Sequence, residues 1–284
     1  MSKRELLRRM GKSAFFMVGI TICLIIVLLA IFAPCITPFS PTKVNLIDKF
    51  IAPEFFSKGT QGHVFGTDAV GQDILARLLY GARISLVIAV CAVLCSCVIG
   101  TVLGLIGGYF GGKVDLIVVS LSDIQLSLPT MMLAIAVMAV LGASAVNLLI
   151  VMSLTGWVAY ARMARSTVMS IRESDFIRAA QVLGASKRRI LFRELLPNCV
   201  TPIIIQASQQ VGFVIMMEAG LSFLGCGVPA TTPTWGTMIS DGRAYITYAP
   251  WTVLVPGVAL MITVLAFNFL GDGLRDILDP KNKR

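Results

Sequence analysis

Six apolar stretches of membrane-spanning length constrain the fold of this chain more than any other feature. A helix needs about 20 apolar residues to cross the hydrocarbon core of a bilayer. Hydrophobic residues make up 56% of the chain and charged residues 14%, which is more apolar surface than one globular core requires. The sequence therefore predicts an all-α integral membrane protein with six transmembrane helices, at residues 14–36, 84–108, 116–141, 146–161, 202–224 and 251–271.

The distribution of basic residues predicts how these helices are oriented. Lysine and arginine are retained on the cytoplasmic side, and six spans place both termini on the same side. Of the 24 basic residues, 18 fall on that side, so we expect both termini to be cytoplasmic. The first apolar run is longer than a secretory signal and is expected to remain as an anchor. The expected organisation is a cytoplasmic N-terminus (1–13), a first transmembrane helix (14–36), an external loop (37–83), a five-helix core (84–271) containing a cytoplasmic loop (162–201), and a cytoplasmic tail (272–284).

The cytoplasmic loop contains a charged segment, 171–197, that has the features of two short helices. Apolar residues at helical spacing predict the first helix, namely Phe176, Ile177, Ala180 and Leu183. Gly184 is expected to end that helix, and Ser186 to cap a second helix that closes at Pro197. The small side chains of Ala179 and Ala180 would let the backbone of another protein approach closely. The segment is therefore predicted to be a docking site.

The external loop ends in a glycine-rich stretch with two aspartates, Asp68 and Asp73. This pattern predicts a turn followed by a helix that begins near Asp68 or Gln72. Asp73 in the first turn of that helix would suit the positive end of the helix dipole. The alternating acids of an EF-hand are absent from the sequence, so a helix start is favoured over a calcium site.

The sequence offers little for catalysis or for holding a cofactor. It has no GxxxxGK[ST] motif to cradle the phosphates of a nucleotide, and its single histidine, His63, falls in the expected external loop. Cys91 and Cys95 share a helical face, but such cysteines more often pack between helices than bind a metal ion. We predict no catalytic residue, no metal site and no bound cofactor in this chain. The net charge of +9 is not accompanied by an aromatic-basic motif for nucleic acid.

Two acids lie deep within the predicted spans, Asp123 and Glu218. A carboxylate in a bilayer has to be paired or hydrated. One reading places both along a translocation path, where they would bind a positive group of the substrate. The alternative is that they form hydrogen bonds between helices, or cap a helix that is kinked at Pro129. Glu218 is the stronger path candidate, and Met216 is included with it, although paired methionines usually pack between helices.

Three stretches of the chain resemble a known family. RAAQVLGASKRRILFRELLPN, from residue 178, resembles the EAA motif of bacterial ABC importer permeases, and Arg178 stands where the motif has its glutamate. The matching residues are Ala179, Ala180, Gly184, Leu196 and Pro197. The external FGTDAVGQDILARLLYGARISL, and the run EAGLSFLGCGVP, PTWGTMI and NFLGDGLRDILDP, resemble the peptide and nickel branch of that family. Together they cover most of the chain in the order of the second of the two permease subunits.

The resemblance implies a type I importer in the bacterial cytoplasmic membrane. Its expected partners are a homologous second permease, two ATPase subunits that bind ATP and Mg²⁺, an extracytoplasmic substrate-binding protein and the lipid bilayer. The charged segment would be a coupling helix that contacts an ATPase through Arg178, Ala179, Ala180, Leu183, Gly184, Ala185, Ser186, Lys187, Arg188, Leu196 and Pro197. The implied cargo is dipeptides or oligopeptides, with nickel or a metal chelate as the alternative. A secondary transporter working alone is less favoured, because the sequence has no convincing internal repeat.

Overall fold

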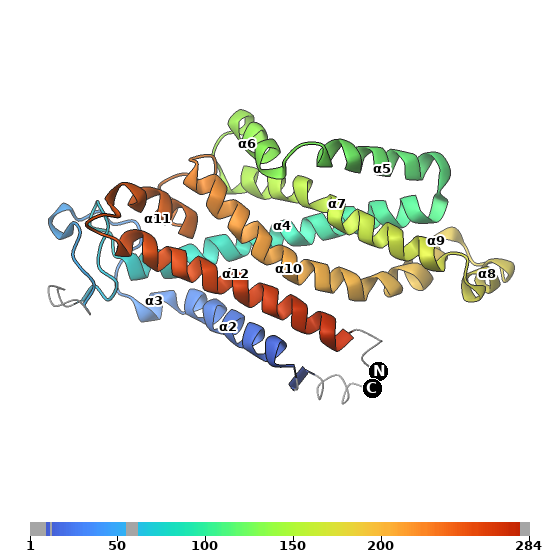
Figure 1. Ribbon diagram of the computed structural model, residues 1–284, viewed down its shortest axis with the longest axis horizontal. Coiled ribbons are helices and arrows are strands. Elements are labelled where there is room, and N and C mark those ends of the chain that lie inside the picture. The colour runs from blue at the N-terminus through green and yellow to red at the C-terminus, as the bar shows by residue number, and fades with distance from the viewer. Residues whose placement is uncertain (1–9, 12, 55–61, 279–284) are drawn as a thin grey trace.

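The computed structural model describes residues 10–11, 13–54 and 62–278, whose regular elements are helical (Figure 1). The long elements are α2 (Ala14–Ile31), α4 (Ile74–Phe110), α5 (Gly112–Leu126), α6 (Thr130–Leu141), α7 (Ala145–Ile171), α10 (Leu196–Phe223) and α12 (Trp251–Leu278). The short ones are α3 (Ala33–Ile36), η1 (Leu46–Asp48), α8 (Asp175–Val182), α9 (Lys187–Arg189), η2 (Ile190–Leu195), α11 (Trp235–Gly242) and η3 (Arg243–Tyr245). The predicted all-α class is confirmed.

The number of apolar helices agrees with the predicted membrane protein. Within the described residues, five helices are long and apolar enough to cross a bilayer, and α5 with α6 forms a sixth span if this bent pair is counted as one. The first span is shorter than predicted, because α2 ends at Ile31 and the chain resumes as α3 after Phe32. The predicted six spans therefore correspond to five helices and one broken pair.

The centre of the molecule is the contact between α4 and α7, which is made close by glycines on one face of α4. A Cβ at Gly100 or Gly104 would collide with the backbone oxygen of Trp157 or Ala161. A Cβ at Gly108 would lie 3.0 Å from the Cβ of Val168. Small residues four apart let two helix backbones approach within a membrane, where van der Waals contact rather than the hydrophobic effect drives helix association.

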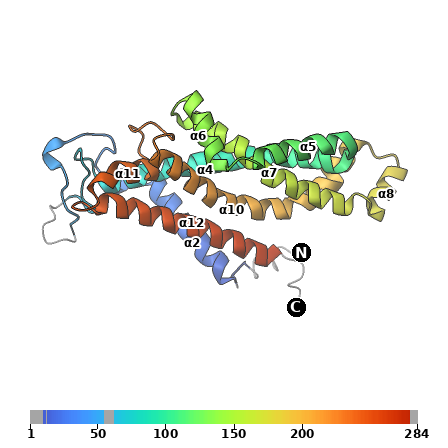
Figure 2. The same cartoon turned by 45° about the horizontal axis from the view of Figure 1, so that its top comes forward.

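The predicted span 116–141 is wrong as a single helix. The chain bends by 86° between α5 and α6. Pro129 lies at the start of α6 with φ −56° and ψ 126°, and it has no N–H to continue the hydrogen-bond ladder of α5. A proline also pushes the residue before it out of helical conformation, so α5 has to end before Leu128. Figure 2 shows α5 running beside α7 while α6 stands away from the bundle.

Two other helix boundaries differ from the predicted ones because charged side chains inside the helices find partners. The helix predicted from residue 84 begins at Ile74, and Asp73 is its N-cap, accepting from the Ala76 amide at 2.7 Å. The segment 37–83, predicted as an external loop, is therefore helical from residue 74. The helix predicted to end at residue 161 continues to Ile171, past Arg162 and Arg165, which both pair with acids of α5.

The predicted closure of the second short helix at Pro197 is also wrong. The chain is helical without interruption over Lys187–Phe223, so the short helix is the beginning of a long one. The residues of η2 form a π-helix, in which the Leu196 amide donates to the Leu191 oxygen. A proline inside an α-helix clashes with the carbonyl four residues earlier, and the wider π turn accommodates the ring without ending the helix.

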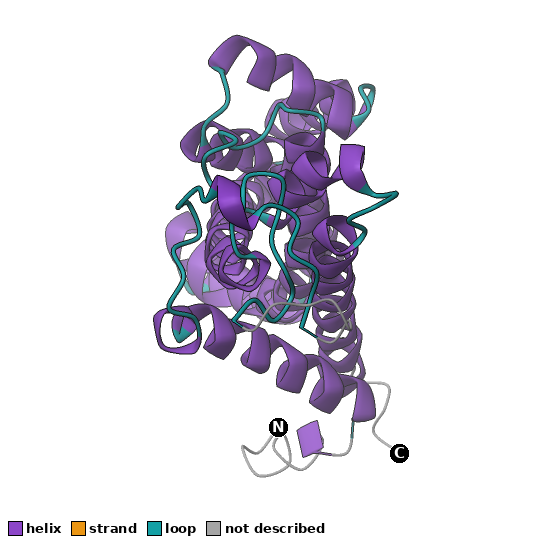
Figure 3. Cartoon of the chain, turned by 90° about the vertical axis from the view of Figure 1, so that its left-hand side faces the viewer, coloured by secondary structure: helices purple, strands orange, loops and turns teal. Residues whose placement is uncertain are grey.

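The two ends of the bundle are built differently. One end carries α8, and the first turn of α2 and the last turn of α12 lie toward that same end (Figure 1). The other end carries α11 and the loop 37–73, whose turns cover it in the end-on view of Figure 3. Most of the predicted N-terminal segment 1–13, and residues 279–284 of the predicted tail, lie outside the described residues.

Candidate functional site

The segment 175–189 adopts the predicted helix, tight turn and second helix start. Helix α8 ends at Val182, and Gly184 in the turn that follows has φ +77°. The Gly184 amide donates to the Gln181 oxygen and the Ala185 amide to the Ala180 oxygen, each at 3.0 Å. This is the Schellman pattern, which needs a residue in the left-handed region and favours glycine. Ser186 then caps the second helix, because its Oγ accepts from the Arg189 amide at 3.3 Å.

Most of the large apolar side chains in and just after α8 are exposed. Ile177 is fully buried and anchors the helix to the bundle. Val182 and Leu183 are 87% and 86% exposed, and half of the Phe176 side chain is exposed. The predicted apolar face is therefore divided: one residue packs inward, and the others point out of the molecule. Large apolar side chains that are exposed together mark a contact surface for another molecule.

The outward surface of this segment is strongly basic. Arg178, Lys187, Arg188 and Arg189 are exposed, and none of them forms an ion pair with another described residue. Lys187 lies over the Phe110 ring, with 5.6 Å from Nζ to the centroid, which holds the start of the second helix against the end of α4. Ala179 is exposed, whereas Ala180 and Ala185 are half-buried. The segment thus combines apolar, small and cationic side chains on one accessible surface.

The segment is joined rigidly to the bundle on its C-terminal side. Ile190, Leu191 and Leu195 of η2 are buried, Leu196 is half-buried and Pro197 is exposed. Because the helix continues from Lys187 to Phe223 without a break, a displacement at Ser186 is carried into α10. Helix α7 enters the segment from the other side at Ile171. One long helix therefore ends just before the segment, and the other begins within it.

The three predicted path residues occupy three different environments. Asp123 lies on α5, and its Oδ1 accepts from Arg162 of α7 at 2.6 Å, with both side chains exposed. Met216 is half-exposed on α10. Glu218 is fully buried, and its two carboxylate oxygens accept from the Ser85 and Ser222 hydroxyls at 3.0 and 2.9 Å. The structure does not bring these residues together.

A cavity that the sequence reasoning missed lies beside the bend between α5 and α6. Its volume is about 210 Å³, and the residues around it are uncharged. Its polar lining comes from Thr130, Thr155 and Gln210, and its apolar lining from Leu126, Met152, Gly156, Val158, Ala159, Phe213, Val214 and Met217. The sequence carries a signal for it, because Gln206, Gln209 and Gln210 interrupt an apolar run. Met217 lines this cavity while the next residue, Glu218, is buried elsewhere.

The residues considered for metal binding are separate in the structure. Among the described residues, no group of three or more His, Cys, Asp and Glu side chains could hold a metal ion, and Cys91 and Cys95 are free thiols. His63 is nearly buried in the outer loop, where its Nδ1 lies 2.8 Å from the Asp73 Oδ2. This contact ties the loop to the first turn of α4.

Comparison with protein families gives two consecutive matches along the chain. Residues 100–284 match the binding-protein-dependent transport system inner membrane component. Residues 4–53 match the N-terminal transmembrane domain of oligopeptide transport permease C. The two matches leave only a stretch of the outer loop and the first part of α4 between them.

Curated relatives cover nearly the whole chain. The dipeptide transport system permease protein DppC of Alkalihalophilus pseudofirmus is 44% identical over 99% of this chain and 90% of its own length. DppC of Escherichia coli is 44% identical over 94% of this chain and 89% of its own. The oligopeptide transport system permease protein OppC of Bacillus subtilis is 38% identical over 99% of this chain and 90% of its own.

A solved structure shares the fold. The inward-facing MetNI methionine ABC transporter contains a chain that matches with a TM-score of 0.56 at 20% identity. The match covers 72% of this chain and 97% of the other. At that identity the likeness concerns the arrangement of helices alone.

Proposed function

The chain belongs to the family of binding-protein-dependent transport system inner membrane components, and we propose that it is the C-type permease subunit of an ATP-driven peptide importer. In this proposal it forms half of a translocation path for dipeptides and oligopeptides, and a homologous permease forms the other half. Relatives named for dipeptides and oligopeptides favour peptides over nickel as cargo.

The observation that carries the proposal is the exposed surface of the segment 175–189. The sequence has no GxxxxGK[ST] motif, so the energy for transport has to enter through a contact with an ATPase subunit. Val182 and Leu183 offer apolar side chains to such a partner, and Lys187, Arg188 and Arg189 offer positive charge around them. Two ATPase subunits would bind ATP and Mg²⁺, one of them seated on this segment.

The same segment explains how ATP binding would move the path. Closure of the ATPase pair displaces α8, and the uninterrupted helix Lys187–Phe223 carries that displacement into α10. Helix α7 moves with it, because it ends just before the same segment. The cavity beside the α5–α6 bend lies between these two helices, so its shape follows their tilt. This is rigid-body gating, in which two states differ in their contacts with the ATPase.

We assign the translocation path to the side of α10 that carries Gln210 and Met217. Uncharged hydrogen-bonding groups suit the peptide backbone, which is common to all peptides, and Met152 and Phe213 tolerate varied side chains. Asp123 and Met216 are exposed and remain path candidates. Glu218 is enclosed by Ser85 and Ser222, which supports its alternative role as a link between α4 and α10.

The proposed orientation places α8 in the cytoplasm and α11 on the outer side of the bacterial cytoplasmic membrane. It is supported by the excess of lysine and arginine on the α8 side. Both termini are then cytoplasmic. An extracytoplasmic binding protein would dock on the end formed by the loop 37–73 and α11.

Reconstitution of the complex with the products of neighbouring genes tests the proposal. Transport and ATP hydrolysis are measured with a dipeptide, an oligopeptide mixture and a nickel–histidine chelate, each loaded on the binding protein. We expect stimulation by the peptides alone. Stimulation by the chelate alone, or transport by this chain without any ATPase, would contradict the proposal.

A further inference from the structure

The outer end of the molecule contains a second and larger cavity, of about 510 Å³. One wall is formed by residues 41–44 and 68–72 and the start of α4, and the other by α11 and the turn before it. We call this cavity the outer pocket. Its lining is mostly apolar, with Val44, Val70, Met238 and Tyr245 among the wall residues. It shares no lining residue with the cavity beside the α5–α6 bend, to which we assign the path, so the two cavities are separate.

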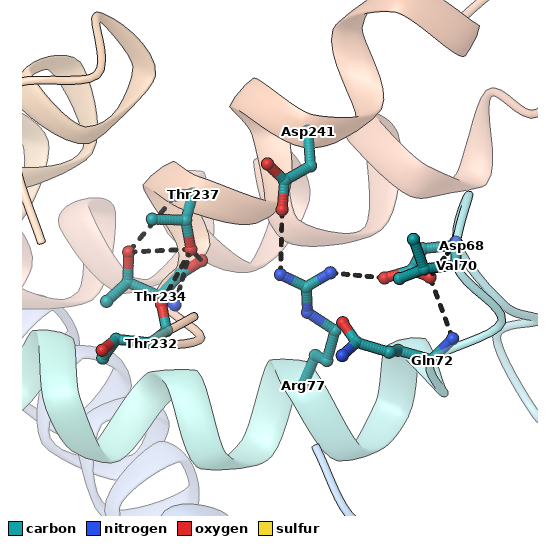
Figure 4. Close-up of polar contacts among 8 residues, drawn as sticks. All are labelled: Asp68, Val70, Gln72, Arg77, Thr232, Thr234, Thr237 and Asp241. Atoms are coloured by element: carbon teal, nitrogen blue, oxygen red, sulfur yellow. Dashed lines mark hydrogen bonds and ion pairs between the residues drawn. The ribbon is translucent and has the colours of Figure 1, made fainter. Parts of the chain in front are cut away.

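Three charged side chains meet at the outer pocket (Figure 4). Arg77 projects from the first turns of α4 and is 5% exposed. Its two terminal nitrogens donate to Asp68, and to Asp241 of α11 at 3.0 Å. Two carboxylates therefore share one guanidinium, which leaves the group with one excess negative charge. Its Nε is buried and has no hydrogen-bond partner among the described residues, so the network is incomplete in the free chain.

The two carboxylates differ in whether their second oxygen already accepts a hydrogen bond. Asp68 is nearly buried, and its second oxygen accepts from the Val70 and Gln72 amides, both at 2.9 Å. The Asp241 side chain is 44% exposed, and its second oxygen accepts no hydrogen bond from a described residue. Asp241 is therefore the group that can accept a cation from outside.

The pocket walls are held in place before any ligand arrives. Helix α11 begins with a capping box, in which the Thr237 amide donates to Thr234 at 3.2 Å and the Thr234 amide to Thr237 at 2.9 Å. The Trp235 indole donates to the Leu78 oxygen of α4 at 3.1 Å. On the opposite wall, Gly71 has φ +74°, and a Cβ there would collide with the Asn45 oxygen. A preformed site loses little conformational entropy on binding.

We propose that the outer pocket receives a lysine or arginine side chain of the extracytoplasmic binding protein when that protein docks. This inference rests on the function proposed above. A long basic side chain matches the pocket, because its aliphatic stem packs on the apolar wall while its charged head reaches Asp241. Free peptide is the less suitable occupant, because cargo bound here would lie off the proposed path and would have to leave again. The geometry therefore assigns Asp241 to docking.

The variant Asp241→Asn tests the assignment, since it removes the charge and keeps the shape. The probe is the purified binding protein, and its Kd for the wild-type and variant complexes in lipid nanodiscs is measured at low and high salt. We expect the Kd to rise about tenfold, the size of one lost charge-assisted hydrogen bond. The salt dependence of the association rate is also expected to weaken. Glu54→Gln is the matched control, because Glu54 is an exposed carboxylate of the same loop that does not line the pocket.

Two further variants distinguish the loss of the charge from a change in the structure of the pocket. Asp241→Glu keeps the charge and should bind nearly as well as wild type, and Asp241→Lys should bind worse than Asp241→Asn. An unchanged Kd for Asp241→Asn would overturn the inference and leave the proposed function intact. Unchanged docking with a raised KM for peptide would also overturn it, because the pocket would then belong to the cargo. A wild-type complex that binds no binding protein would overturn both proposals.

Discussion

The outer end and the coupling end of this chain, the latter being the segment 175–189, show opposite uses of the same residue types. At the outer end, Arg77 is buried between two aspartates, and the Trp251 indole of α12 donates to the Thr67 oxygen of the loop before α4. At the coupling end, four basic residues are exposed, and so are the apolar side chains of Val182 and Leu183. Most charged groups at the outer end are paired within the chain, whereas the exposed side chains at the coupling end are the ones that we propose a partner covers.

Because the two ends differ in this way, substitutions at each end should affect different properties of the protein. A buried charge that loses its partner destabilises the fold, so substitutions at the outer end should first lower stability. An exposed apolar side chain contributes little to folding, so substitutions at the coupling end should first affect assembly and ATP use. Four substitutions test this contrast, in decreasing order of their expected effect on stability.

The largest loss of stability is expected for Asp68→Ala at the outer end. It would leave the buried Arg77 with one partner and two backbone amides without an acceptor. Removing one member of a buried ion pair typically costs about 3–5 kcal/mol. The free energy of unfolding of the purified protein measures it. Glu173→Gln is the matched control just before the coupling end, because the Glu173 side chain is 71% exposed. Its pair with Arg172, at 3.5 Å, should contribute less than about 1 kcal/mol. Equal losses of unfolding free energy in Asp68→Ala and Glu173→Gln would contradict the expected difference between the two ends.

Ile177→Ala should have the next largest effect, because this residue is the buried anchor of α8. Truncating a buried isoleucine typically costs about 2–4 kcal/mol. The loss should be local, so hydrogen exchange of the α8 amides should speed up while the outer loop is unchanged. Phe176→Ala, a half-exposed neighbour, serves as the control and should alter α8 exchange much less. If Ile177→Ala increased hydrogen exchange equally in α8 and in the outer loop, the helix would not be anchored separately.

Gly184→Val should destabilise the fold less than Ile177→Ala does, but it should impair the stimulation of ATP hydrolysis. A Cβ at Gly184 has no atom within 4 Å, so the penalty is the left-handed backbone conformation alone, about 1–2 kcal/mol. The turn would reorganise, and ATP hydrolysis should lose its stimulation by loaded binding protein. Gly184→Asn should retain most of that stimulation, because asparagine tolerates this conformation. Normal stimulation in the valine variant would show that the turn does not transmit the signal.

Leu183→Ser should change stability least, by less than about 0.5 kcal/mol, because the side chain has almost no contacts to lose. It should nevertheless reduce the amount of ATPase that co-purifies with the complex. Ile47→Ser is the control, since Ile47 is 92% exposed at the outer end and should not affect ATPase assembly. If Leu183→Ser lost more folding stability than Ile177→Ala, Leu183 rather than Ile177 would be the residue that anchors the segment.

Features encoded by neighbouring residues could be predicted from the sequence. The turn at Gly184, the cap at Ser186 and the helix start near Asp73 depend on contacts within a few residues, and each appears close to its predicted position. The apolar runs likewise located the spans, because a membrane helix requires length and apolarity alone.

Features that depend on distant partners were missed. The predicted spans 84–108 and 146–161 leave out Arg77 and Arg165, although the helices include both. Their partners Asp241 and Asp115 lie 164 and 50 residues away in the sequence. Pro197 signalled a helix end, and the π turn that accommodates it has no sequence signature. For Glu218, a hydrogen bond between helices was one of the two predicted roles, but its partner Ser85, 133 residues away, was not predicted.

The most direct test of the coupling surface is a photo-crosslinking amino acid placed at Leu183 in the assembled transporter. We expect the amino acid at this position to crosslink to an ATPase subunit, and the crosslinking yield to change when ATP traps the closed ATPase pair. The same label at Ile47 should give no ATPase product and serves as the control. Crosslinking at Leu183 only to lipid or to the second permease, in both nucleotide states, would contradict the central claim.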